Sequence, residues 1–186
     1  MGKTYRLALI LIFTSCLVAC SALDVQPVTK PMVPSPLPTY KVGDKFVSKV
    51  AIVKDEQEVV AVNDKTVTIK SSAFGTLTQY RDFSTPDQVL SGLFPLKVGN
   101  RVSGTGSFSY NSTGTYERTC VVEDQVRATV PAGSFETYQV VCEMEYSYPS
   151  GTSSELDLIW YSPEINHWVA ILRHGRMFVL LSYDKN

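Results

Sequence analysis

The segment Thr137-Tyr138-Gln139-Val140-Val141-Cys142-Glu143-Met144-Glu145-Tyr146-Ser147-Tyr148 alternates between apolar and polar side chains along its length. The apolar residues, from Tyr138 to Tyr148, fall on one face, and the polar ones, from Thr137 to Ser147, fall on the other, with Val141 as the exception. A period of two predicts an antiparallel β-strand with one buried face and one solvated face.

The same period continues in the next segment, where Leu156, Leu158 and Trp160 alternate with Glu155 and Asp157. We expect the leucine and tryptophan side chains to be buried and the two carboxylates to face solvent.

Turn signals separate the other β-rich runs. Asn63-Asp64-Lys65 predicts a hairpin, and Pro131-Ala132-Gly133-Ser134 predicts a second turn. Met177–Leu181 is apolar on both faces, which predicts a central or covered strand. Thr85-Pro86-Asp87 predicts the start of one short helix, because a capping hydroxyl precedes proline. The pattern therefore predicts an all-β fold of about ten strands: an antiparallel curved sheet, half-barrel, barrel or sandwich.

A weak internal repeat lies within this region. Lys41-Val42-Gly43-Asp44-Lys45 matches Lys97-Val98-Gly99-Asn100-Arg101, and each is followed by a strand-like run. The match indicates either a duplicated β-unit or a common turn that is used twice.

The N-terminal residues have the features of a targeting segment. Lys3 and Arg6 precede the mostly apolar run Leu7–Cys20, which is shorter than the roughly 20 residues that a spanning helix needs. This arrangement is typical of a secretory signal peptide, with residues 1–19 removed.

The run ends in Leu17-Val18-Ala19-Cys20, which resembles the lipobox of bacterial lipoproteins. The resemblance implies that the Cys20 thiol receives a diacylglyceryl group, that cleavage occurs before Cys20 and that the new amine is acylated. Ser21 after the cysteine implies sorting to the outer membrane in a Gram-negative cell. The alternative is an ordinary cleaved signal peptide with an incidental cysteine.

Five of the ten prolines lie between Asp24 and Thr39. Proline fixes φ and removes a backbone donor, so we expect an extended tether over residues 20–39, of roughly 60 Å reach. The β-domain would then cover residues 40–186. Once Lys3 and Arg6 are removed, 15 basic and 18 acidic side chains remain, so there is no basic excess for nucleic-acid binding.

The four cysteines divide by position: Cys16 in the signal peptide, Cys20 for lipidation, and Cys120 and Cys142 in the β-domain. Because an exported compartment is oxidising, we predict a Cys120–Cys142 disulfide. The loop that it closes corresponds to about 3 kcal/mol of stability.

Candidate catalytic and metal-binding residues are few. We expect His167 and His174 at surface or turn positions, since two histidines do not make a zinc site. Asp55, Glu56 and Glu58 are expected at a solvated hairpin tip, with no calcium-loop spacing. The sequence thus predicts no catalytic residue, no bound metal and no cofactor.

Three short segments are similar to motifs of secreted bacterial β-rich domains of unknown function, many of which are lipoproteins. They are Phe94–Gly99, Val130–Thr137 and Trp160–Glu164, and the similarity spans roughly residues 40–183. It implies a curved antiparallel sheet resembling lipid carriers, and it carries no catalytic residues.

Two hypotheses of function follow, with a hydrolase as a lesser third. The first is a non-enzymatic envelope lipoprotein that binds a partner protein or envelope component. The second is a carrier whose curved sheet shelters a lipid or another apolar ligand in an aromatic-lined cup. An apolar cavity would favour the carrier, and an exposed apolar patch would favour partner binding.

Overall fold

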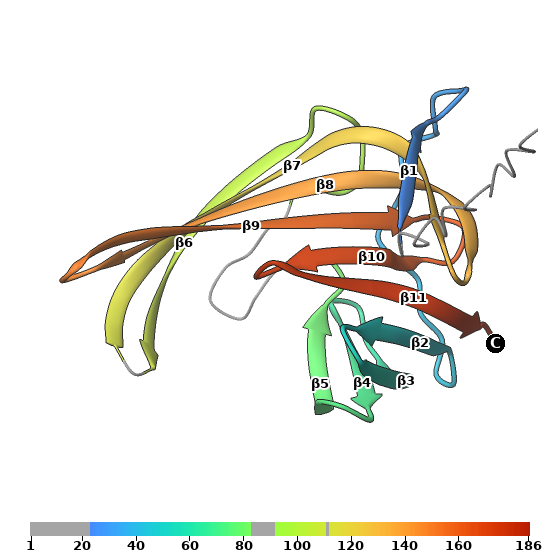
Figure 1. The fold of residues 1–186 in the computed structure, drawn as a ribbon, viewed down its shortest axis with the longest axis horizontal. Coiled ribbons are helices and arrows are strands. Elements are labelled where there is room, and N and C mark those ends of the chain that lie inside the picture. The colour runs from blue at the N-terminus through green and yellow to red at the C-terminus, as the bar shows by residue number, and fades with distance from the viewer. Residues whose placement is uncertain (1–22, 83–91, 111) are drawn as a thin grey trace, which may run out of the picture.

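The computed structural model describes residues 23–82, 92–110 and 112–186. Within these residues, eleven antiparallel strands form one curved sheet that is not closed into a barrel (Figure 1). This confirms the predicted all-β class. The strands are β1 (Asp24–Pro27), β2 (Lys45–Val50), β3 (Val53–Val62), β4 (Thr66–Ser71), β5 (Gly75–Tyr80), β6 (Arg101–Tyr110), β7 (Ser112–Val130), β8 (Gly133–Tyr148), β9 (Gly151–Ser162), β10 (His167–Arg173) and β11 (Arg176–Asp184).

The strand order is β1-β7-β8-β9-β10-β11-β2-β3-β4-β5. The long strand β7 pairs with β6 along its N-terminal part and with β1 along its C-terminal part. Strand β11 lies between β10 and β2, and Val179 and Leu180 are buried there, as the apolar pattern of Met177–Leu181 predicts.

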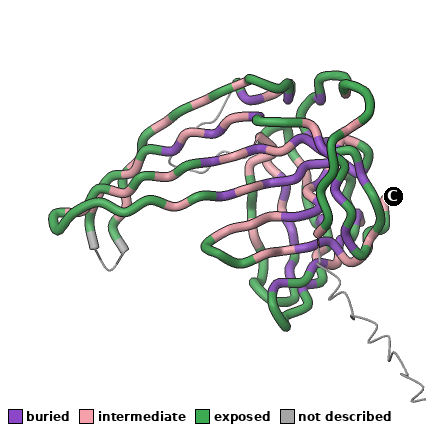
Figure 2. Tube along the Cα trace, turned by 45° about the horizontal axis from the view of Figure 1, so that its top comes forward, coloured by how far each residue is buried: buried purple, intermediate pink, exposed green. Residues whose placement is uncertain are grey.

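Part of the sheet extends beyond the main body as an arm. We use this name for residues 103–110, 112–119, 143–148 and 151–156, on β6 to β9. Figure 1 shows these strands projecting past the other strands, and Figure 2 shows that their residues are mostly exposed or half-buried. The core therefore lies in the body, where the sheet curls over itself.

The two copies of the sequence repeat form the same turn. Gly43 and Gly99 have φ values of 93° and 91°, a left-handed conformation that favours glycine. The amide of Gly43 donates to the carbonyl of Val59 at 2.8 Å, and the amide of Gly99 donates to that of Val122 at 2.9 Å. In return, each valine amide donates to the carbonyl of the residue that follows the glycine.

A β-bulge follows both valines, after Val59 in β3 and after Val122 in β7. A common turn does not require a bulge in the next strand. The shared bulge therefore favours a duplicated β-unit, with β2–β3–β4 as the first copy and β6–β7–β8 as the second.

The proline-rich segment lies along the body rather than standing away from it. Strand β1 pairs with Val126–Thr129 of β7, and Ser35 bridges to Leu96. Proline removes amide donors but leaves carbonyl acceptors, and side chains of the body use them. The Tyr138 hydroxyl donates to the carbonyl of Val33 at 2.7 Å, and Arg81 Nε donates to that of Pro38 at 2.7 Å.

Strand β1, Val33, Ser35 and Pro38, all expected to lie in an extended tether over residues 20–39, thus contact the body instead. The signal peptide expected over residues 1–19, the predicted lipidation site Cys20 and the helix expected at Thr85-Pro86-Asp87 lie outside the described residues. Nothing in the described part of the chain is a helix long and apolar enough to cross a membrane.

Candidate ligand-binding cavity

A cavity of about 450 Å³ lies between two parts of the curved sheet. Strands β3 and β5 form one wall, and strands β7, β9, β10 and β11 form the other. Small-molecule sites have volumes of about 300–1,000 Å³. The lining residues are Asp55, Gln57, Phe74, Leu77, Thr78, Gln79, Tyr80, Arg118, Ile159, Trp168, Ile171, Arg173 and Phe178.

The pairing register of β9, β10 and β11 brings three apolar side chains together on one wall of the cavity. Ile171 on β10 lies directly opposite Ile159 on β9 and directly opposite Phe178 on β11. Directly opposed residues share a face, so the three side chains form a row across three strands. Leu77 lines the facing wall, where Phe74 is 53% exposed.

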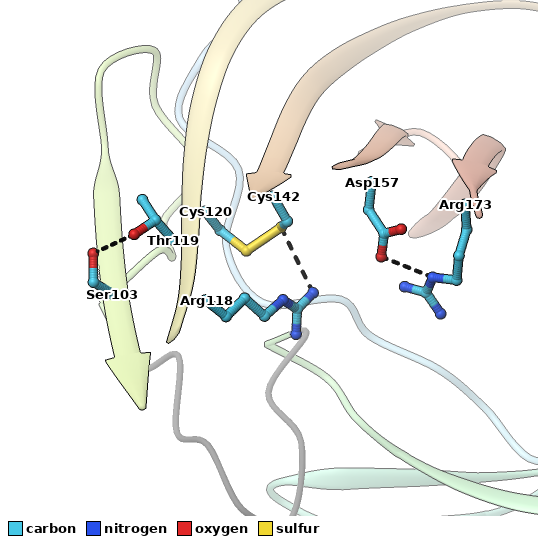
Figure 3. The surroundings of a disulfide bond; sticks show 7 residues. All are labelled: Ser103, Arg118, Thr119, Cys120, Cys142, Asp157 and Arg173. Carbon is cyan, nitrogen blue, oxygen red and sulfur yellow. Dashed lines mark hydrogen bonds and ion pairs between the residues drawn. A yellow bond between two sulfur atoms is a disulfide. The ribbon is translucent and has the colours of Figure 1, made fainter. Parts of the chain in front are cut away.

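Arg118 enters the cavity from β7 and is 4% exposed. Its Nη2 lies 3.6 Å from the Sγ atom of Cys142, and Figure 3 shows the side chain beside the disulfide. Burial lowers the pKa of Arg118, and the nearby charge of Arg173 lowers it further. The guanidinium nevertheless remains charged at neutral pH.

Asp157 and Arg173 form an ion pair next to Arg118 (Figure 3). Arg173 Nε donates to Asp157 Oδ2 at 2.8 Å, and the Asp157 side chain is only 6% exposed. The expectation that Asp157 faces solvent is therefore wrong, and Leu156, expected to be buried, is 47% exposed. Asp157 lies directly opposite Cys142, so it shares the inner face with the disulfide.

Asp55 lines the opposite wall at the position equivalent to Arg118. Each lies four residues before the bulged valine of its unit. Burial would raise the pKa of Asp55, but hydrogen bonds from Ser71, Gln57 and the Ala73 amide outweigh it and lower the pKa.

The acidic cluster is thus only partly solvated. Asp55 is 1% exposed, contrary to prediction, whereas Glu56 and Glu58 are exposed. All three lie on β3 rather than at a hairpin tip, because β2 and β3 meet at residues 51–52. Among the residues that the structure describes, no three His, Cys, Asp or Glu side chains form a metal-binding group.

The predicted disulfide joins Cys120 on β7 to Cys142 on β8. The two residues are directly opposite in the register, with Cα atoms 4.0 Å apart. In the first unit the equivalent positions hold the Gln57–Ser71 pair. The disulfide thus covalently links β7, which carries Arg118, to β8.

The two histidines, His167 and His174, differ in burial. His174 lies in the turn between β10 and β11, as predicted, and its Nδ1 is 3.1 Å from Glu155 Oε2. His167 was expected at the surface or in a turn, but it is 1% exposed and stacks on Phe46 with ring centroids 3.8 Å apart. Burial lowers its pKa to about 3. Its cover comes from Tyr40 and Phe46, more than 100 residues away along the chain.

Four aromatic side chains meet on the arm. Phe108, Tyr116, Tyr146 and Tyr148 contact one another with ring centroids 5.3–6.2 Å apart. They are half-buried, so they belong neither to the core nor to the cavity lining.

Comparison with known proteins gives a likeness of fold. No protein-family model matches the chain. No curated protein matches it. A crystal structure of the hypothetical lipoprotein YmcC from Escherichia coli (K12) is similar, with a TM-score of 0.51 and 8% sequence identity. The match covers 84% of this chain and 90% of that one, and at this identity it shows a shared fold.

Proposed function

We propose that this protein is a lipid-anchored protein of the bacterial cell envelope whose β-domain binds an apolar ligand without catalysing a reaction. The observation that carries the proposal is the cavity within the curved sheet, with its row of Ile159, Ile171 and Phe178. Concave sites with mostly apolar walls and a few polar groups are typical of small-molecule binding.

The lipid anchor is supported by two further observations. The chain carries the lipobox-like Leu17–Cys20, and the similar structure from E. coli is described as a hypothetical lipoprotein. Ser21 favours the outer membrane. Growth with labelled palmitate tests the anchor: we expect label on the wild type and none on Cys20→Ser. Ser21→Asp is expected to move the protein from outer-membrane to inner-membrane fractions, and an unchanged distribution would contradict the sorting proposal.

Native mass spectrometry of the mature chain extracted from cells tests the cavity. We expect an added mass that is lost in Ile171→Asn, because an amide in the middle of the apolar row is left without a partner when hydrocarbon covers it. Leu156→Asn is the matched control, since Leu156 is exposed on the arm. Retention of the added mass by Ile171→Asn would place the ligand elsewhere.

A second candidate function is the binding of a partner protein through the arm. The aromatic cluster of Phe108, Tyr116, Tyr146 and Tyr148 is half-buried on a projecting element, and aromatic residues are enriched at protein interfaces. Crosslinking in intact cells distinguishes the two candidates: recovery of one specific protein that is lost in Tyr148→Ser would favour the arm.

A further inference from the structure

The charged side chains at the cavity compensate one another within the protein. Arg173 Nε donates to Asp157 Oδ2 at 2.8 Å, beside the Arg118 side chain (Figure 3). Burial lowers the pKa of Arg118, but the negative charge of Asp157 opposes this effect. Asp55, on the facing wall, accepts hydrogen bonds from residues of its own part of the sheet. In the described lining, the two arginines are therefore matched by the two aspartates.

This balance of charge disfavours an ionic headgroup in the cavity. An ion that leaves water without gaining an opposite charge loses several kcal/mol of solvation. A hydrocarbon chain instead gains about 0.8 kcal/mol for each CH₂ group that it buries, and the row of Ile159, Ile171 and Phe178 offers the apolar surface. The cavity therefore favours a chain whose headgroup carries no charge.

The lining also contains uncharged hydrogen-bonding groups. The Gln79 side chain lines the cavity from β5. The Gln57 amide nitrogen donates to Asp55 at 2.6 Å, which leaves the Gln57 carbonyl oxygen as an acceptor. Because an amide can donate and accept without carrying a charge, these side chains suit the hydroxyl, ester or amide groups of a ligand.

We propose that the ligand is an uncharged amphiphile with a single hydrocarbon chain, such as a monoacylglycerol, whose chain lies along the apolar row while its hydroxyl or ester groups face the glutamine side chains. This inference rests on the proposed function, because it requires that the cavity binds a ligand. A volume of about 450 Å³ lies in the lower half of the range for small-molecule sites, which suits a ligand of one chain.

Isothermal titration calorimetry at neutral pH tests the headgroup. The protein is the mature chain with Cys20→Ser, so that no attached acyl chain competes for the cavity. The probes share one chain length: dodecanoylglycerol, dodecanol, dodecanoate and dodecyltrimethylammonium, each below its micelle concentration. We expect the two uncharged probes to bind at least about tenfold tighter than the anion and the cation.

Variants that unbalance the charges test the reason for this selectivity. Asp157→Asn leaves Arg173 without its carboxylate and is expected to tighten dodecanoate binding by about tenfold while leaving dodecanoylglycerol binding unchanged. Glu136→Gln is the matched control, because it also removes one negative charge but Glu136 pairs with Arg127 outside the cavity. Arg173→Gln removes one cation and is expected to shift binding toward dodecyltrimethylammonium. If Asp157→Asn fails to fold, Arg173→Gln still tests the proposal, since the Arg173 side chain is 42% exposed.

The outcomes separate this inference from the proposed function. Equal affinities for all four amphiphiles, or tighter binding of either ion by the wild type, would overturn the uncharged headgroup and leave the cavity as the binding site. Unchanged selectivity in both cavity variants would show that the charge balance does not select the ligand. Absence of binding by every amphiphile would overturn the proposed function itself.

Discussion

The two repeat units begin alike and end differently. In the first unit, β2, β3 and β4 contain 6, 10 and 6 residues, whereas β6, β7 and β8 of the second contain 10, 19 and 16. The turn, the backbone hydrogen bonds and the bulge are the same in both. The added length of the second unit is what forms the arm.

Positions that set the backbone path are the same in the two units, whereas other positions hold different residues. The turn glycine and the bulged valine set the backbone path, so they recur in both units. The inward positions before the bulge do not set that path. They hold Asp55 in one unit and Arg118 in the other, and Gln57–Ser71 in one and the disulfide in the other. The two units thus share a backbone path but place different side chains, Asp55 and Arg118, in the cavity lining.

The largest expected contrast is in the first strand of each unit, where Phe46 and Val102 are equivalent. Phe46 is fully buried, so Phe46→Ala is expected to cost about 3–5 kcal/mol of unfolding free energy. Val102 is half-buried, and Val102→Ala is expected to cost about 1 kcal/mol. Urea denaturation of both variants measures the difference, and equal losses would contradict the unequal burial of these two equivalent positions.

The disulfide belongs to the second unit alone. Cys120→Ala/Cys142→Ala opens a loop with a sequence separation of 22 and is expected to cost about 3 kcal/mol. Denaturation of the oxidised and reduced wild type provides the control, since reduction should reproduce most of the loss. A loss below about 1 kcal/mol would show that the long strands hold their register without the bridge.

The residue after the turn glycine is Asp44 in the first unit and Asn100 in the second, and we expect a smaller difference in stability loss between substitutions at these two positions. Asp44 is 0% exposed and accepts from Lys185 Nζ at 2.6 Å and from the amides of Lys41 and Asn186. Asn100 instead donates to two backbone carbonyls. We expect Asp44→Ala to cost about 2–3 kcal/mol and Asn100→Ala about 1 kcal/mol, measured by thermal and urea unfolding. A larger loss of stability in Asn100→Ala than in Asp44→Ala would contradict the expected difference between the two units.

The smallest effect concerns pH and arises where His167 of β10 stacks on Phe46 of the first unit. Its pKa is lowered to about 3 in the folded protein, so as pH falls below about 6.5 the unfolded chain takes up a proton that the folded chain does not. Stability should therefore fall by about 1.4 kcal/mol per pH unit below that value.

Urea denaturation between pH 6.5 and 5 measures this slope. His167→Gln should remove most of it, and the exposed His174→Gln should retain it. Asp44 and Asp55 have lowered pKa values, so their contribution is lost only at more acidic pH and does not obscure the slope. The same slope in His167→Gln as in the wild type would show that another group is responsible.

Local pattern was sufficient to predict the strands, the Asn63–Lys65 hairpin and the cysteine pair. Alternation failed where both faces of a strand are covered. In β9, Trp160 is buried on one face while Ile159 and Tyr161 are buried on the other, so polarity no longer indicates which side is wet.

The cavity could not be predicted because its walls come from β3 and β5 on one side and from β7, β9, β10 and β11 on the other. Arg118, Asp157 and Arg173 lie on three different strands, and nothing in their local sequence marks them as neighbours. The one usable signal in the sequence is the repeat, because aligning its two turns and the valines that follow them places Asp55 and Arg118 at equivalent positions.

The pairing of β1 with the C-terminal end of β7 has a consequence for how the protein stands on a membrane. With Cys20 acylated, as proposed, only Ser21, Ala22 and Leu23 lie between Cys20 and Asp24, so the Cα atoms of Cys20 and Asp24 are at most about 14 Å apart. From there β7 runs back toward the arm for nearly its whole length of 19 residues, or about 60 Å along the strand. If Cys20 is acylated as proposed, the bilayer and the aromatic cluster lie at opposite ends of one continuous strand, which takes the place of the extended proline tether that the sequence predicts.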